Sequence, residues 1–286
     1  MEGFILPISN NKIDIHAHAV VTSCPNLDFV GYPTPENLLE TYAKYGISQG
    51  VLLPLASPEG RNVIIPTETV EAIASKYPDQ FFWAIGLDPR MLRNNPASDF
   101  GALLEYYKSQ GAKSVGEMIA NLNFDDPLYD NMLAQCAEHD LPVTIHMSPA
   151  IGLDYGVVDD PGLPRLEKML KKYPKLKIFG HSVFFWEHMT VSKDKPGRIH
   201  ELMDKYDNLY CDISAGSGFR AMTTNEEIGL DFLETFRDRV MFGCDFGPNA
   251  VGSLAMWLDR MYLDGRLAED VYQKVCRENA IRILKL

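Results

Sequence analysis

The chain has 286 residues and a formal net charge of −12, with 46% hydrophobic and 23% charged residues. These values are typical of a folded globular protein and exclude disorder for the bulk of the chain. The acidic balance argues against nucleic acid as a main partner, because phosphate binding requires clustered lysine and arginine. No segment approaches 18 consecutive apolar residues, so we expect no membrane-spanning helix.

The five cysteines give an odd number and include no CxxC pair, which disfavours both a disulfide framework and a thiolate zinc cluster. The first ten residues lack the basic segment of a signal peptide. We therefore expect a cytoplasmic protein.

Eight short apolar or β-branched runs, each too short for a helix, predict buried strands. They cover residues 13–15, 50–55, 81–87, 112–117, 142–146, 177–180, 209–213 and 239–242. Helix-like segments lie between them at residues 34–45, 67–77, 100–110, 129–139, 164–173, 197–206 and 225–236. The expected strand ends, from residue 16 to residue 245, follow one another at intervals of 29 to 38 residues.

That spacing predicts α/β architecture: a single (β/α)8 TIM barrel over residues 1–286, with extra C-terminal helices in 254–286. The rival is a doubly wound sheet, which usually carries a glycine-rich turn after its first strand. Here the first strand instead continues into His16 and His18.

Polar side chains recur at the expected strand ends, where TIM barrels place their chemistry. His16 and His18 are two residues apart on one strand, so both imidazoles point to the same face. The further strand-end candidates are Glu117, His146, His181 and Asp245. Imidazole and carboxylate donors suit Zn²⁺, and also Mn²⁺, Fe²⁺ or Co²⁺. We expect one or two divalent ions, with zinc as the first choice.

Four segments carry a resemblance to a known family. They are Ile-Asp-Ile-His-Ala-His at 13–18, Val-Thr-Ile-His at 143–146, Phe-Gly-His-Ser at 179–182 and Met-Phe-Gly-Cys-Asp at 241–245. The chain resembles the amidohydrolase superfamily, in particular the amidohydrolase 2 branch that includes aminocarboxymuconate-semialdehyde and dihydroxybenzoate decarboxylases. The resemblance implies metal binding by His16, His18, His146 and Asp245. It implies that His181 binds a second metal or acts on the substrate.

Glu117 is similar to the strand-four glutamate of TatD-like members, which bridges two metal ions. The alternative for Glu117 is a hydrogen bond to a neighbour at the rim. We favour the metal role.

Substrate-binding candidates follow three of the strands. Trp186 belongs to an aromatic segment, 183–187, which either packs in the core or lines the substrate site. Arg61 and Arg220 are suited to bind a substrate carboxylate or are ordinary surface charges. Arg220 follows the segment 214–218, whose small residues we expect to be flexible.

The resemblance implies a metal-dependent hydrolase of a small-molecule amide, lactone or ester that uses a metal-activated water. Asp245 would accept the proton of that water, and His181 would polarise the carbonyl. The alternative is a metal-dependent non-oxidative decarboxylase of an aromatic or muconate-like acid. A barrel that only binds a ligand is disfavoured because all five family residues are present, and a TatD-like nuclease is disfavoured by the net charge. We expect a small-molecule substrate, no membrane partner and a possible homodimer.

Overall fold

The structure is a computed structural model that describes residues 11–22, 31–60, 63–192, 194–245 and 248–286. The chain divides into two compact units. Unit 1 comprises Met1–Leu52, Ala72–Phe82 and Asp212–Leu286, and unit 2 comprises Leu53–Glu71 and Trp83–Cys211. The prediction of one domain over residues 1–286 stays a prediction.

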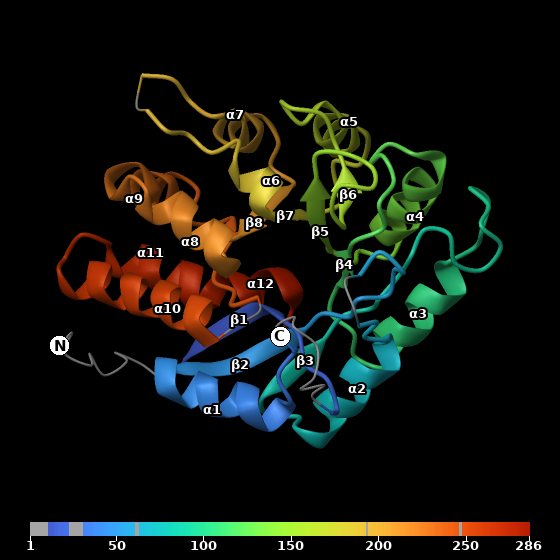
Figure 1. Cartoon of the computed structure of the whole chain (residues 1–286), viewed down its shortest axis with the longest axis horizontal. Coiled ribbons are helices and arrows are strands. Elements are labelled where there is room, and N and C mark those ends of the chain that lie inside the picture. The colour runs from blue at the N-terminus through green and yellow to red at the C-terminus, as the bar shows by residue number, and fades with distance from the viewer. Residues whose placement is uncertain (1–10, 23–30, 61–62, 193, 246–247) are drawn as a thin grey trace. The chain divides into compact units, whose positions relative to one another are not determined.

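Unit 1 contains a three-stranded sheet in the order β1 (Lys12–Ala17), β2 (Ile47–Leu52) and β3 (Phe81–Trp83), with β1 and β2 parallel. A further strand is β9 (Val240–Met241). Its helices are α1 (Pro35–Tyr45), α8 (Ala215–Thr223), α9 (Glu226–Thr235), α10 (Pro248–Leu263), α11 (Glu269–Gln273), a π-helical turn (Lys274–Glu278) and α12 (Asn279–Leu284). Helix α1 packs along β2 (Figure 1).

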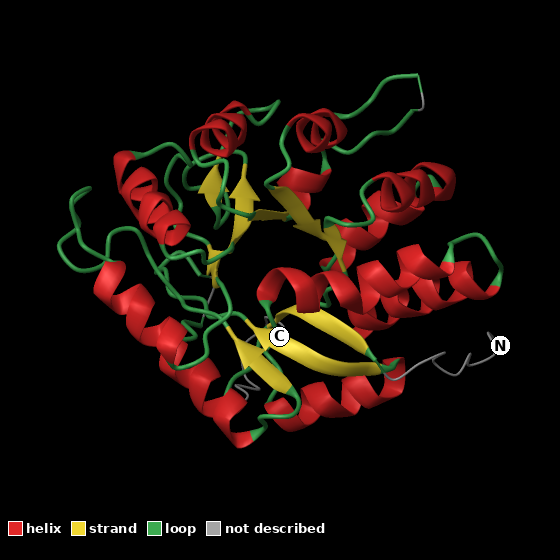
Figure 2. Cartoon of the chain, turned by 180° about the vertical axis from the view of Figure 1, so that it is seen from behind, coloured by secondary structure: helices red, strands yellow, loops and turns green. Residues whose placement is uncertain are grey.

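Unit 2 contains parallel strands in the order β4 (Val115–Met118), β5 (Val143–Ser148), β7 (Ile178–His181) and β8 (Leu209–Asp212), of which the last residue, Asp212, belongs to unit 1. The short strand β6 (Val157–Val158) pairs with the end of β5. The helices of this unit are α3 (Gly101–Ser109), α4 (Pro127–Glu138), α5 (Pro164–Lys172), α6 (Val183–Trp186) and α7 (Arg198–Lys205). Helix α2 (Thr67–Lys76) crosses the border between the two units. Strands alternate with helices along this part of the chain (Figure 2).

Local sequence signals explain where several helices begin. In α1, Thr34 is the N-cap and accepts a hydrogen bond from the backbone of Asn37, and Pro35 occupies the first turn. The helix ends at Gly46, whose φ of +69° is the left-handed conformation favoured by glycine. In α4, Asp126 caps the helix and Pro127 again occupies the first turn.

All eight predicted strands are found, as β1 to β5 and β7 to β9. The seven predicted helices are found as α1 to α5, α7 and α9. The sequence missed β6, α6 and α8. Helix α8 covers most of the segment 214–218 that was expected to be flexible, so that expectation was wrong. Its Gly218 is needed for close packing, since a Cβ there would lie 2.3 Å from the carbonyl oxygen of Ile213.

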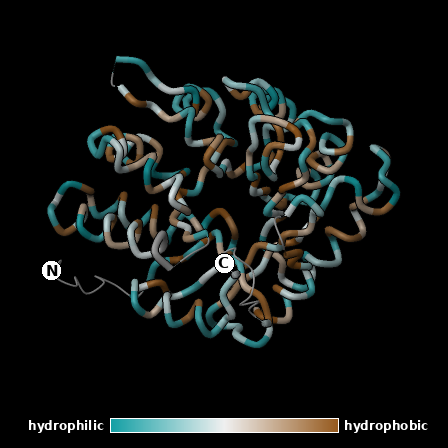
Figure 3. Tube along the Cα trace, in the orientation of Figure 1, coloured by the Kyte–Doolittle hydropathy of each residue, from teal (hydrophilic) through white to brown (hydrophobic). Residues whose placement is uncertain are grey.

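The strands are buried on both faces, which explains why they read as apolar runs without alternation. Hydrophobic and hydrophilic stretches are interspersed along the whole trace (Figure 3). The four cysteines within the described ranges, Cys136, Cys211, Cys244 and Cys276, are buried, and these four form no disulfide. Among the helices described, none is both long and apolar enough to span a bilayer.

Candidate metal site

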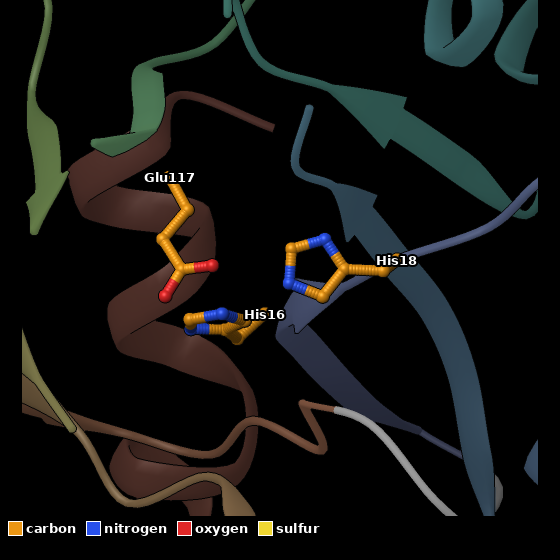
Figure 4. A group of neighbouring side chains, drawn as sticks. All are labelled: His16, His18 and Glu117. Atoms are coloured by element: carbon orange, nitrogen blue, oxygen red, sulfur yellow. The ribbon is translucent and has the colours of Figure 1, made fainter. Parts of the chain in front are cut away.

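Unit 1 brings together His16, His18 and Asp245, which we call donor set 1. The two histidines extend from the carboxyl end of β1, and their ring centroids are 5.2 Å apart (Figure 4). Oδ1 of Asp245 lies 4.0 Å from Nε2 of His16 and 3.8 Å from Nε2 of His18. The backbone N–H of Asp245 also donates to the carbonyl of His16 at 2.7 Å, which ties the end of β9 to β1. Two imidazole nitrogens therefore face one carboxylate oxygen.

A buried carboxylate orients His16 from behind. Nδ1 of His16 lies 3.0 Å from Oδ2 of Asp212, and both side chains are fully buried. The other oxygen of Asp212 accepts hydrogen bonds from the backbone and the hydroxyl of Ser214. With Nδ1–H donated to Asp212, the lone pair of His16 is on Nε2, the nitrogen that faces Asp245. This is the arrangement by which proteins fix a metal-binding histidine.

Asp14 connects β1 to the segment that carries Asp245. Its Oδ1 accepts hydrogen bonds from the backbone of His16 at 2.9 Å and of Cys244 at 2.8 Å, and its Oδ2 accepts one from the Tyr42 hydroxyl at 2.6 Å. Burial raises the pKa of Asp14 to about 6, against the opposing effect of these hydrogen bonds. Asp14 is thus a support for donor set 1.

Unit 2 brings together Glu117, His146 and His181, which we call donor set 2. All three are buried, and one ligand atom from each lies within 4.8 Å of the others. His146 and His181 are register partners on β5 and β7, with ring centroids 5.4 Å apart. Nδ1 of His146 lies 2.7 Å from Oε1 of Glu117, whose side chain extends away from its backbone (Figure 4).

Gly116 allows Glu117 to reach this position. The φ of Gly116 is +141°, and a Cβ at this residue would lie 2.8 Å from the carbonyl oxygen of Thr144 on β5. A side chain would therefore clash with backbone and strain φ as well. The close approach of β4 to β5 requires glycine here.

The residues of both sets fit a divalent metal. Each set offers two histidines and one carboxylate, the donors that Zn²⁺ and Mn²⁺ accept. In donor set 1, Oδ1 of Asp245 lies 4.0 Å and 3.8 Å from Nε2 of the two histidines, and in donor set 2 the three ligand atoms lie within 4.8 Å of one another. Ligands of one ion can be spaced in this way.

The structure describes two of the three predicted substrate-binding residues, and these two differ in burial. Trp186 is in α6, buried at 5% exposure and packed edge-on against Phe185. Arg220 is exposed on α8, with its guanidinium close to Gly216. Arg61 lies outside the described residues. Substrate binding by these three residues stays a prediction.

Sequence reasoning missed the contact of Asp212 with His16, and also the contact of Tyr155 with His146, whose ring centroids are 4.1 Å apart. The position of Asp14, two residues before His16, could have indicated that Asp14 supports donor set 1, because both side chains lie on one face of β1. Tyr155 had no such signal, because it belongs to an irregular segment.

The sequence model of the amidohydrolase family matches residues 13–286. The chain belongs to the amidohydrolase family. This family consists of TIM-barrel enzymes, so the predicted α/β barrel class and the predicted enzyme are both confirmed. A comparison with curated protein sequences finds no significant match.

Solved structures similar to this chain include two decarboxylases and a hydrolase. The 2,6-dihydroxybenzoate decarboxylase from Rhizobium is 16% identical, with 98% of this chain and 99% of that chain covered and a TM-score of 0.67. The 5-carboxyvanillate decarboxylase from Novosphingobium aromaticivorans, complexed with manganese and 4-hydroxy-3-methoxy-5-nitrobenzoic acid, is 14% identical, with both chains fully covered and a TM-score of 0.65. A probable 2-pyrone-4,6-dicarboxylic acid hydrolase from Acinetobacter baumannii is 13% identical, with 96% and 100% covered and a TM-score of 0.61. At these identities the likeness shows the fold.

Proposed function

We propose that this amidohydrolase is a metal-dependent hydrolase of a small-molecule amide, lactone or ester, with one divalent ion in each donor set. The observation that carries the proposal is that both sets are complete. His16, His18 and Asp245 need no further residue to bind an ion, and neither do Glu117, His146 and His181. A divalent ion suits hydrolysis, because it can activate a water and stabilise the charge that develops on an oxygen. Zinc is our first choice of metal and manganese the second.

The residues of the two sets have separate tasks in this reaction. A bound divalent ion supplies Lewis acidity, which lowers the pKa of a water and polarises a carbonyl oxygen. Asp245 accepts the proton of the attacking water on its carboxylate, whose 19% exposed side chain reaches solvent while His16 is fully buried. His181 would hold the ion of donor set 2 or, where it binds no ion, donate a hydrogen bond to the carbonyl oxygen as negative charge develops there. Asp212 and Asp14 keep donor set 1 in place.

A second candidate, non-oxidative decarboxylation of an aromatic or muconate-like acid, is favoured by one contact. The 2.7 Å hydrogen bond between Glu117 and Nδ1 of His146 is also how a carboxylate orients a histidine without binding metal itself. Glu117 would then leave donor set 2 with two histidines, and one ion would suffice. The decarboxylases among the similar structures agree with this candidate.

Isotope labelling separates the two reactions. The enzyme, loaded with Zn²⁺ or Mn²⁺, is incubated in ¹⁸O water with a panel of lactones, amides, esters and aromatic carboxylic acids. Hydrolysis places one ¹⁸O atom in the product carboxylate and releases no carbon dioxide. Release of carbon dioxide that is lost in His181→Ala would establish decarboxylation instead. His200→Ala, a histidine change on α7 outside both sets, is the matched control.

A further inference from the structure

The segment between β5 and β6, residues 149–156, folds back over His146. The ring of Tyr155 lies against the imidazole of His146, with centroids 4.1 Å apart and planes inclined by 35°. The next residue, Gly156, has a φ of +116°, and a Cβ there would lie 2.6 Å from the carbonyl oxygen of His146. The backbone therefore approaches His146 as closely as glycine permits.

Asn121, a buried residue after β4, fastens this segment on both sides of Tyr155. Its amide nitrogen donates to the carbonyl oxygens of Asp154 at 2.9 Å and Gly156 at 3.0 Å. Its amide oxygen accepts a hydrogen bond from the backbone of Gly152. One side chain thus fixes the backbone immediately before and after the aromatic residue.

Burial of apolar side chains does not explain why the segment is held there. Ile151 and Leu153 are 64% and 71% exposed, so the apolar residues of the segment point largely into solvent. The polar contacts at its base, the ring of Tyr155 on His146 and the strand β6 that follows it, which pairs with β5, connect the segment to unit 2. The effect of this arrangement is to cover one face of a candidate metal ligand.

We propose that Tyr155 is a positioning residue: its ring, fixed by Asn121, restricts the imidazole of His146 to the orientation that serves donor set 2. This inference rests on the proposed metal role of donor set 2. His146 keeps its Nδ1 contact with Glu117 only within a narrow range of ring rotation, and the tyrosine ring limits that rotation. Loss of the ring frees the imidazole and weakens metal binding at donor set 2, while donor set 1 keeps its own support from Asp212.

Metal affinity provides the first test. In a His18→Ala background, where donor set 2 is the remaining complete set, we measure the Kd for Zn²⁺ by chelator competition. Tyr155→Leu and Asn121→Ala should each raise that Kd about tenfold, the size of effect expected for a group that orients a ligand. Tyr155→Phe, which keeps the ring, should stay within about twofold, and so should the control Leu153→Ala. An unchanged Kd in Tyr155→Leu, or an equal rise in Leu153→Ala, would overturn the proposal.

The metal-free protein provides a second test that does not depend on the proposed function. The ring protons of His146, assigned with His146→Gln, should show the ring-current shift of a stacked tyrosine. That shift should disappear in Tyr155→Leu and persist in Tyr155→Phe. If the parent His18→Ala protein binds no metal, the proposed function fails, and the His146 resonances alone decide on Tyr155. Resonances that Tyr155→Leu leaves unmoved would overturn its positioning role.

Discussion

Donor set 1 and donor set 2 contain the same kinds of ligand, two histidines and one carboxylate, but the protein holds them in different ways. In donor set 1, His16 is oriented by Asp212, a buried carboxylate that belongs to β8 and is itself fixed by Ser214. In donor set 2, His146 is oriented by Glu117, a member of the set, and by the ring of Tyr155. Support from regular strands resists disturbance better than support from an irregular segment, so we expect donor set 2 to be the weaker metal site.

The largest effect should follow from removing one ligand of each set. His18→Ala and His146→Ala should each lose one metal equivalent and lower kcat/KM by at least about 10³-fold, because each removes one of the two Lewis acids. Elemental analysis after dialysis, with His200→Ala as the control, measures the stoichiometry. If both variants keep the full metal content, the two sets do not bind metal.

The variant Asp212→Asn tests how Asp212 supports donor set 1. An amide in place of the carboxylate cannot hold His16 as an ionic acceptor does, so the Kd of the ion in donor set 1 should rise about 10- to 100-fold. The ion in donor set 2 should be retained with unchanged affinity. Chelator competition measures donor set 1 in a His146→Ala background and donor set 2 in a His18→Ala background. A loss of both ions together would show that Asp212 supports the fold and not one set.

Gly116→Ala should test the backbone support of donor set 2. The new Cβ would lie 2.8 Å from the carbonyl oxygen of Thr144. We therefore expect the free energy of unfolding, measured in urea, to be about 2 kcal/mol lower than in the parent. Gly111→Ala is the matched control: its φ is +108°, but nothing lies within 4 Å of the new Cβ. Equal losses of unfolding free energy in the two variants would mean that φ strain, and not the close approach of β4 to β5, makes glycine necessary at residue 116.

The smallest effect concerns the substrate side of unit 1. If Arg220 binds a substrate carboxylate, Arg220→Met should raise KM about tenfold for an acidic substrate and leave kcat within about twofold, since one charge-assisted contact is lost. A neutral ester should show no change. An identical KM for both substrate types in the variant and the parent would remove Arg220 from the site.

Sequence reasoning predicted the strands well because most of them are buried on both faces and form short apolar runs between helices. The six candidate ligands followed from their places at strand ends. What it missed depends on contacts between distant segments. The residues of α8 were expected to be flexible because a glycine such as Gly218 is compatible both with a flexible backbone and with tight packing. Likewise, Tyr155 contacts His146 through a backbone that the distant Asn121 helps to fix. No local pattern carries that information.

The most direct test of the two-ion account is a crystal structure of the zinc-loaded protein with anomalous diffraction at the zinc edge. We expect two anomalous peaks, one about 2.0–2.1 Å from the ligating nitrogens of His16 and His18, and one at that distance from His146 and His181. Oxygens of Asp245 and Glu117 should complete the two sets. A single peak in donor set 1, with Glu117 bonded only to Nδ1 of His146, would contradict the account and favour the one-ion decarboxylase.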